Sequence, residues 1–466
     1  MTRSAAIDRA VAQYDTGVFH EVLARRIAIP SESQNPERSA ALMGYLAEEM
    51  RPALERIGFT CRLLPNPDGK HGPFLIGERM EGAGLPTVFT YGHGDVIRGQ
   101  DEQWAQGLSP WRLQKDGRRL YGRGTADNKG QHTINLTALE SVLATRGKLG
   151  FNLKILIETG EETGSPGLRE LCAAERERLR ADVLIASDGP RLTPERATLY
   201  LGTRGAFNFD LNLTLREGGH HSGNWGGLLA NPGIVLAHAI ASITTVAGQI
   251  LIPEWLPPPM PASVKRALAD CVVDGGPDGP TIDTNWGEPG FSPAERVFGW
   301  NSFEVLAYRT GNPDRPVNAI PHRASAHCQI RFVAGSDHTQ FLPALRRHLD
   351  RRGYGKIELS AARDSVSAAT RLDPDHPWVR WAVDSVIRTT GKKPAVLPNL
   401  GGTLPNDIFA DLLGLPTVWV PHSYASCSQH APNEHMLEPI VREGLAVMAG
   451  LFWDLGEGGV PARTAT

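Results

Sequence analysis

Apolar positions in the first 200 residues follow two periodicities in turn. "TVFTYGH" (87–93), "FNLKILIETG" (151–160) and "ADVLIASDG" (181–189) are short apolar runs typical of buried strands. Between them lie stripes with helical spacing, and residues 36–58 are the clearest, with apolar side chains at Leu42, Leu46, Met50, Leu54 and Ile57. Strands that alternate with helices predict an α/β fold with a mostly parallel sheet and helices on both faces.

The pattern changes near residue 200. "GAFNFDLNLTL" (205–215) alternates with period two, as a half-exposed strand does, and "SFEVLAYRTG" and "RASAHCQIRFV" add further strands. Helical segments are expected near 232–247 and 338–350, and a Pro/Gly-rich excursion at 253–290. We therefore predict an α/β catalytic domain built from residues 1–199 and 367–466, interrupted by an inserted, mostly antiparallel α+β domain at 200–366.

Composition narrows the class of protein. The chain has 466 residues and a net charge of −3, so no basic surface suggests nucleic acid as a partner. No apolar run approaches the roughly 20 residues of a membrane span, and the N-terminus lacks the apolar core of a signal peptide. The five cysteines are scattered without a C-x-x-C pair, which is typical of free thiols in a reducing compartment. We expect a cytoplasmic protein that does not bind membranes.

Candidate chemistry follows the predicted strands. Ligands of open α/β sheets bind at the carboxyl ends of the strands. The polar side chains expected at that rim, in the strand ends and two loops, are His93, Asp95, Asp127, Glu161, Glu162, Asp188 and His430. Carboxylates so close together repel one another unless a cation neutralises them. Imidazole with carboxylate suits zinc, manganese or cobalt rather than calcium. Asp127, in a loop between ligand-bearing segments, is the natural bridge between two ions.

Five motifs extend this picture to a family. "TYGHGDV", "GRGTADNKG", "ETGEETGSPGL", "IASDG" and "HAPNE" occur in this order. Their order and spacing resemble those of the dinuclear zinc metallopeptidases, a family that includes carnosinases, cytosolic nonspecific dipeptidases, carboxypeptidase G, aminoacylase, and the acetylornithine and succinyl-diaminopimelate deacylases. The resemblance covers nearly the whole chain, the insertion included.

The resemblance implies a role for each rim residue. It implies two divalent ions, with zinc preferred over manganese or cobalt, and Glu161 as the general base that activates a water between them. Asp95 would orient an imidazole ligand from behind. The implied ligands are His93 and Asp188 for one ion, Glu162 and His430 for the other, and Asp127 for both.

Three further expectations concern a cis peptide bond, the choice of histidine ligand and a glycine beside His93. The resemblance implies a cis peptide bond between Asp127 and Asn128. His430 and His435 are both candidates for the histidine ligand of the second ion. We prefer His430, because the family's ligand precedes a short Asn-Glu element, as His430 does here. Gly94 stands where relatives carry a larger side chain, so we expect the site to be wider near His93.

Further motifs resemble the family's substrate-binding elements. In "EGGHHSGNWGG", His221 matches a histidine that reaches into the active site of the partner subunit, which implies a homodimer formed through the inserted lid and dimerisation domain. Asn318 and Arg331 match a pair that grips the substrate. "NLGGTLPND" matches a turn whose N–H groups meet a substrate carboxylate, here at Gly401, Gly402 and Thr403.

We therefore predict a metal-dependent hydrolase that cleaves an amide bond next to a free carboxylate, as a dipeptidase or carboxypeptidase does. The alternative is hydrolysis of an N-acyl or N-carbamoyl amino acid, because the deacylases share every catalytic residue named above. A more remote alternative is a metal-binding protein without activity. The retained Glu161 argues against it, because a general base has no purpose in such a protein.

Overall fold

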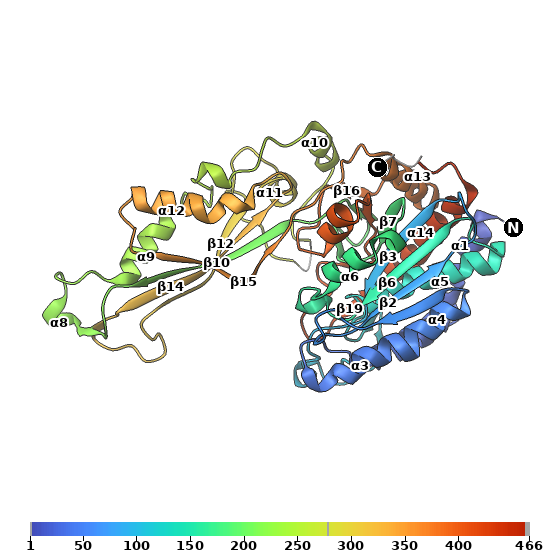
Figure 1. The fold of residues 1–466 in the computed structure, drawn as a ribbon, viewed down its shortest axis with the longest axis horizontal. Helices are drawn as coiled ribbons and strands as arrows, with labels where there is room; N and C mark the ends of the chain where they lie inside the picture. The colour runs from blue at the N-terminus through green and yellow to red at the C-terminus, as the bar shows by residue number, and fades with distance from the viewer. Residues whose placement is uncertain (1, 277–278, 462–466) are drawn as a thin grey trace.

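The computed structural model describes residues 2–276 and 279–461. The molecule is elongated, and two sheets lie at its two ends (Figure 1). Both chain termini lie at the end that holds the larger sheet, so the smaller sheet is an insertion (Figure 1). Among the described helices, none is both long and apolar enough to span a lipid bilayer.

The larger sheet has eight strands, and its central four, β6, β3, β7 and β17, run parallel. Their carboxyl ends therefore meet at one edge, as the sequence predicts. The outer strands include antiparallel pairs, so the sheet is mixed. In spatial order the strands are β1 (Thr60–Leu64), β2 (Phe74–Arg79), β6 (Asn152–Glu158), β3 (Thr87–His93), β7 (Val183–Ala186), β17 (Thr417–Trp419), β9 (Thr198–Tyr200) and β16 (Ala395–Leu397).

Alternate residues of these strands fill two separate cores, because successive strand side chains point to opposite faces. Val88 and Ile155 belong to the core that contains residues of α1, α2, α5, α13 and α14. Phe89 and Leu156 belong to the core that contains residues of α6 and the π-helical turn η7. The helices are α1 (Arg3–Asp15), α2 (Val18–Ile27), α5 (Lys129–Arg146), α6 (Leu168–Ala174), η7 (Ile408–Leu412), α13 (Pro377–Thr390) and α14 (Glu438–Glu457).

The helix predicted over residues 36–58 forms as a continuous helical run. It begins with η1 (Pro36–Arg38), continues through α3 (Ser39–Gly44) and the π-helical segment η2 (Tyr45–Met50), and ends with α4 (Arg51–Arg56). Leu42, Leu46, Met50 and Leu54 are buried, as their spacing predicts. Gly58, just beyond the end, has a φ of 83°, the left-handed conformation common after helices.

The inserted sheet is antiparallel, with strand order β12-β14-β10-β15. Its core includes residues of α9 and α12. The elements are β10 (Gly205–Thr214), α9 (Pro232–Ala241), β12 (Ser302–Thr310), β14 (Arg323–Phe332), α12 (Phe341–Arg351) and β15 (Glu358–Ser367). An α+β insertion is thus present, while the boundaries at 199/200 and 366/367 stay a prediction.

The Pro/Gly-rich excursion returns to the larger sheet. It contains α10 (Ala262–Leu268), and α11 (Pro293–Phe298) follows directly after it. Val264, Leu268 and Phe298 belong to the same core as Phe89 of β3. The excursion and α11 therefore pack against the larger sheet, where they form a wall of the cavity described below.

Candidate metal centre

The structure brings the predicted rim residues together from segments far apart in the sequence. His93 is the last residue of β3, Asp188 follows β7, and Asp127 precedes α5. Glu161 and Glu162 begin the short 3-10 helix η4 (Glu161–Thr163), which follows β6. The convergence expected from parallel strand ends is therefore present.

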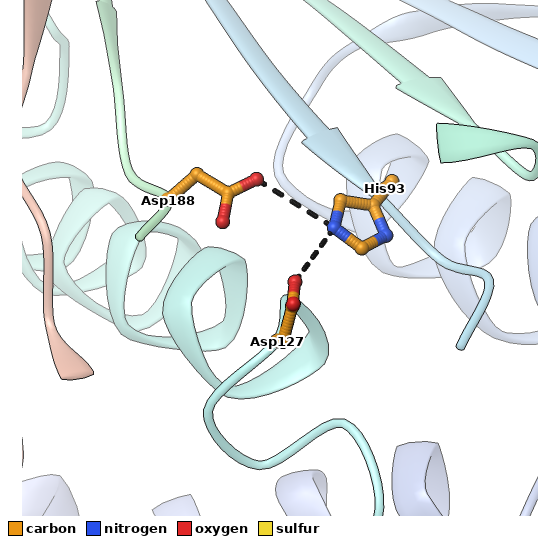
Figure 2. A group of neighbouring side chains, drawn as sticks. All are labelled: His93, Asp127 and Asp188. Atoms are coloured by element: carbon orange, nitrogen blue, oxygen red, sulfur yellow. Dashed lines mark hydrogen bonds and ion pairs between the residues drawn. The ribbon is translucent and has the colours of Figure 1, made fainter. Parts of the chain in front are cut away.

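Asp127 lies at the centre of this cluster. Its Oδ1 lies 2.9 Å from Nε2 of His93, and its Oδ2 lies 3.1 Å from Nε2 of His430. Nε2 of His93 also lies 3.5 Å from Oδ2 of Asp188. The side chains of His93, Asp127 and Asp188 point toward one another (Figure 2). The two oxygens of one carboxylate thus face two different imidazoles.

Two groups of potential metal ligands share this carboxylate. The first is His93, Asp127 and Asp188, and the second is Asp127, Glu162 and His430. Within each group the candidate ligand atoms all lie within 4.8 Å of one another, and Oε2 of Glu162 lies 3.0 Å from Nε2 of His430. These are the two ligand sets that the resemblance implies.

The electrostatics of the cluster favour a bound cation. Burial raises the pKa of Glu161 well above its ordinary value, and burial with the nearby charge of Asp127 raises the pKa of Glu162 to about 7. Hydrogen bonds to Asp127 and Glu162 raise the pKa of His430 to about 11. Without a cation, the two glutamates would therefore tend to keep protons that a carboxylate ordinarily loses well below pH 7. His430 would keep a proton that an imidazole ordinarily loses near pH 7.

The buried carboxylate of Asp188 also favours a bound cation. Oδ2 of Asp188 is buried, and its partner among the described residues is the long contact of 3.5 Å to Nε2 of His93, which lies closer to Asp127, while Oδ1 accepts a hydrogen bond from the N–H of Gly189 at 2.6 Å. A buried carboxylate with so long a contact is poorly compensated, because burying a charge is costly unless it is paired and hydrogen-bonded. Nitrogen and oxygen ligands around such an atom fit zinc, manganese or cobalt.

Asp95 holds the turn that carries the two glutamates. Its carboxylate accepts hydrogen bonds from the N–H groups of Glu161 at 3.2 Å and Glu162 at 3.1 Å. Oδ1 of Asp95 lies 3.4 Å from Nδ1 of His93, but the backbone carbonyl oxygen of Asp95 lies closer to that nitrogen, at 3.1 Å. Asp95 therefore contacts His93 as the sequence predicts, and it also orients the glutamates.

The loop before α5 is held by a residue to which the sequence analysis assigned no role. Glu434 is buried and accepts hydrogen bonds from the N–H groups of Ala126 at 2.9 Å and Asp127 at 3.0 Å. It also forms a buried ion pair with Arg123 at 2.8 Å. The expected cis peptide bond between Asp127 and Asn128 is present. Glu434 belongs to the quoted motif "HAPNE", which is the only sequence signal that could have indicated it.

Gln429 is a second residue near Asp127 that the sequence did not indicate. Its Nε2 donates a hydrogen bond to Oδ2 of Asp127 at 2.5 Å, the oxygen that faces His430. His435, the alternative to His430, points elsewhere, because its Nε2 lies 2.5 Å from the hydroxyl of Tyr424 and its Nδ1 lies 2.9 Å from the carbonyl oxygen of Asn433. The geometry therefore favours His430 over His435.

The expectation for Gly94 is wrong. A Cβ added there would lie 2.3 Å from Cδ1 of Tyr45, whose ring occupies the space that a larger side chain would take. Tyr45 is fully buried and its hydroxyl lies 2.6 Å from Nε2 of His132. The glycine therefore makes room for a packed ring behind the metal cluster and does not widen the site.

A cavity of about 630 Å³ opens beside the cluster. It is lined by Asp127, Glu161 and Asp188 together with the predicted carboxylate-binding turn at 401–403. Its other walls include Val272 and Val273 of the excursion and Phe298 of α11. A volume of this size suits a small-molecule substrate.

The other predicted substrate residues lie elsewhere in this chain. His221 and Asn318 are exposed next to α8 (Ser222–Trp225), at the end of the insertion farthest from the larger sheet (Figure 1). Arg331 lies on β14, where its Nη1 is buried without a hydrogen-bond partner among the described residues. None of these three lines the cavity beside the metal cluster.

Comparisons with known proteins agree with this geometry. Residues 89–454 match the model of peptidase family M20/M25/M40. The chain is 30% identical to a Beta-Ala-His dipeptidase of Rattus norvegicus, over 94% of this chain and 93% of the relative. It is 27% identical to a succinyl-diaminopimelate desuccinylase of Maricaulis maris, over 76% of this chain and 77% of the relative.

A solved structure supports the fold. The di-peptidase Dug1p of Saccharomyces cerevisiae superposes with a TM-score of 0.79 at 20% identity, covering 98% of this chain and 99% of that one. The match of the family model over most of the chain, with the full-length similarity to the rat enzyme, establishes the relationship. The chain belongs to peptidase family M20/M25/M40 and is a hydrolytic enzyme that acts on C–N bonds.

Proposed function

We propose that the protein is a metal-dependent dipeptidase that cleaves the amide bond of a small peptide with a free carboxylate. The observation that carries this proposal is the pair of ligand groups that share Asp127 at the wall of a substrate-sized cavity. His93 and Asp188 would hold one divalent ion, and Glu162 and His430 the other. When bound, the ions would supply Lewis acidity toward the scissile carbonyl and favour ionisation of water. Zinc is the preferred metal for this ligand set.

Glu161 is the group that moves the proton. Its Oε2 lies 4.0 Å from Nε2 of His93, and it lines the cavity. Because Asp95 accepts hydrogen bonds from both glutamate N–H groups, Glu161 and Glu162 are held in a fixed turn. Glu161 takes the proton of the attacking water and delivers it to the leaving nitrogen, while Glu162 faces the cluster.

A substrate panel tests this proposal. We expect the zinc-loaded enzyme to hydrolyse dipeptides with a kcat/KM roughly 10–100-fold higher than that for the same dipeptides with an amidated C-terminus. The reason is that a charge-assisted hydrogen bond to a carboxylate contributes about 1.5–3 kcal/mol. N-acyl and N-carbamoyl amino acids complete the panel. Equal rates for acids and amides, or no hydrolysis of any dipeptide, would contradict the proposal.

Deacylation is the second candidate. The Maricaulis maris relative is a desuccinylase, and the cluster geometry serves either reaction. A preference for N-acyl amino acids over every dipeptide in the same panel would favour this candidate. The metal ligands and the role of Glu161 would be unchanged.

We also propose a homodimer formed through the insertion. Edge strand β12 exposes Val305, Leu306 and Tyr308, and apolar side chains on an edge strand are suited to pairing with a second copy. In that dimer His221 would enter the active site of the partner subunit and stabilise the oxyanion. The five free thiols suit a cytoplasmic location.

Mixed subunits test the dimer. We expect His221→Ala to lower kcat by roughly 10²–10³-fold, the usual cost of losing an oxyanion donor. Mixing this variant with Glu161→Gln should restore about a quarter of wild-type activity, because half of randomly formed dimers are hybrids with one competent site. His220→Ala is the matched control and should stay active. A monomer by light scattering, or no recovery in proven hybrids, would contradict the proposal.

A further inference from the structure

A second cavity, of about 450 Å³, lies where the insertion joins the larger sheet. Val273, Gly275 and Val297 line both this cavity and the one beside the metal cluster, so the two cavities adjoin each other. The second cavity contains none of the metal-ligand candidates. It is therefore a separate space, which the proposed reaction does not use.

Two residues that line this second cavity each carry a buried N–H donor without a partner in the described chain. Arg204, immediately before β10, is only 6% exposed, and its Nε has no hydrogen-bond partner among residues 2–276 and 279–461. The indole Nε1 of Trp300 is also buried without a partner there. Both are N–H groups, so the ligand that satisfies them must offer acceptor atoms.

The charge of Arg204 specifies the acceptor further. Its Nη2 donates only to neutral oxygens, the carbonyls of Trp300 at 3.3 Å and Arg331 at 3.2 Å and the hydroxyl of Ser302 at 3.1 Å. No carboxylate within the described chain forms an ion pair with it. Burial and the nearby charge of Arg331 lower the pKa of Arg204 to about 10, so the guanidinium stays charged at pH 7. A water could satisfy one N–H but would leave the buried charge without a hydrogen-bonded counter-ion.

The remaining walls determine the body of the ligand. Trp286, Phe303 and Ile250 line the cavity, and Trp286 is 53% exposed, unusually high for so large an apolar side chain. Glu304 also lines the cavity, and burial raises the pKa of its carboxyl, an effect that the nearby charge of Arg204 partly offsets. We propose that this hinge cavity binds a carboxylate that carries an aromatic group, with the carboxylate on Arg204 and Trp300 and the ring among the aromatic side chains.

Calorimetric titration of the holoenzyme with phenylacetate tests this inference. We expect binding of phenylacetate, and at least tenfold weaker binding of neutral phenylacetamide. Trp300→Phe keeps the ring and removes the donor, and should weaken phenylacetate binding roughly tenfold. Arg204→Gln should weaken it further. Glu304→Gln should strengthen it several-fold, because it removes the competing negative charge, and a misfolded variant could not produce such a gain.

The same titrations contain the results that would overturn the inference. Absence of phenylacetate binding would do so. Binding that keeps wild-type affinity in Trp300→Phe and Arg204→Gln would also do so, because the ligand would then lie elsewhere, for example at the metal cluster. Peptide hydrolysis measured with added phenylacetate distinguishes two natural sources of the carboxylate. Competitive inhibition indicates that the cavity holds the far end of a longer substrate, whereas a change in kcat indicates a separate carboxylate effector. Either result requires that phenylacetate binds in the hinge cavity.

Discussion

Glu161→Gln lowers kcat for peptide hydrolysis by roughly 10²–10⁴-fold, the range that general acid–base catalysis contributes. Glutamine has the size of glutamate but neither accepts a proton from water nor returns one to the leaving nitrogen. Glu161 belongs to neither ligand group, so the metal content of the variant should equal that of the wild type. Steady-state kinetics with elemental analysis of the same preparation measures both quantities.

The control for this substitution lies in the same cavity. Glu195 lines it but is exposed and outside both ligand groups, so Glu195→Gln should keep wild-type kcat. Activity of Glu161→Gln within a few-fold of the wild type, with full metal content, would contradict the role of Glu161 as the general base. Loss of metal in that variant would instead indicate that Glu161 binds an ion.

Asp127→Asn is expected to cause the second large loss, that of both metal ions. The two carboxylate oxygens of Asp127 face His93 and His430, so this one substitution should weaken both metal sites. Groups that only orient a ligand contribute about 10–100-fold to metal affinity, and a shared ligand should contribute more than that. We expect the zinc content to fall from two ions per chain to one or none, and hydrolysis to be lost with it.

Asp274→Asn is the matched control for this variant. Asp274 lines the same cavity but is exposed and belongs to neither ligand group, so zinc content and activity should stay at wild-type values. Thermal unfolding of both variants shows whether each is folded. A folded Asp127→Asn enzyme that retains two zinc ions per chain would contradict the bridging role.

Much of the fold and of the site could be predicted from the sequence because the signals are local. Apolar runs such as 87–93 predict buried strands, and the polar residues directly after them must lie at the carboxyl edge of a parallel sheet. This argument places His93, Glu161 and Asp188 on one rim without knowledge of any distance. The alternation in 205–215 likewise predicts β10, because its period of two requires a strand.

What could not be predicted depends on contacts between distant segments. Glu434 holds the Asp127 loop from more than 300 residues away, and nothing near either residue indicates the pairing. The sequence suggested extra space at Gly94, but the ring of Tyr45, from the helical run at 36–56, fills that space. The sequence places the excursion in the insertion, yet its helix α10 contributes Val264 and Leu268 to a core of the larger sheet. In each case the partner is set by tertiary packing.

Anomalous diffraction from crystals of the zinc-loaded enzyme, collected at the zinc edge, shows whether Asp127 is shared by two ions. The two-ion proposal predicts two peaks per chain, about 3.5–4 Å apart as in two-metal hydrolases, on either side of the Asp127 carboxylate. One peak lies beside His93 and Asp188, and the other beside Glu162 and His430. A single peak, or two peaks without Asp127 between them, would contradict it.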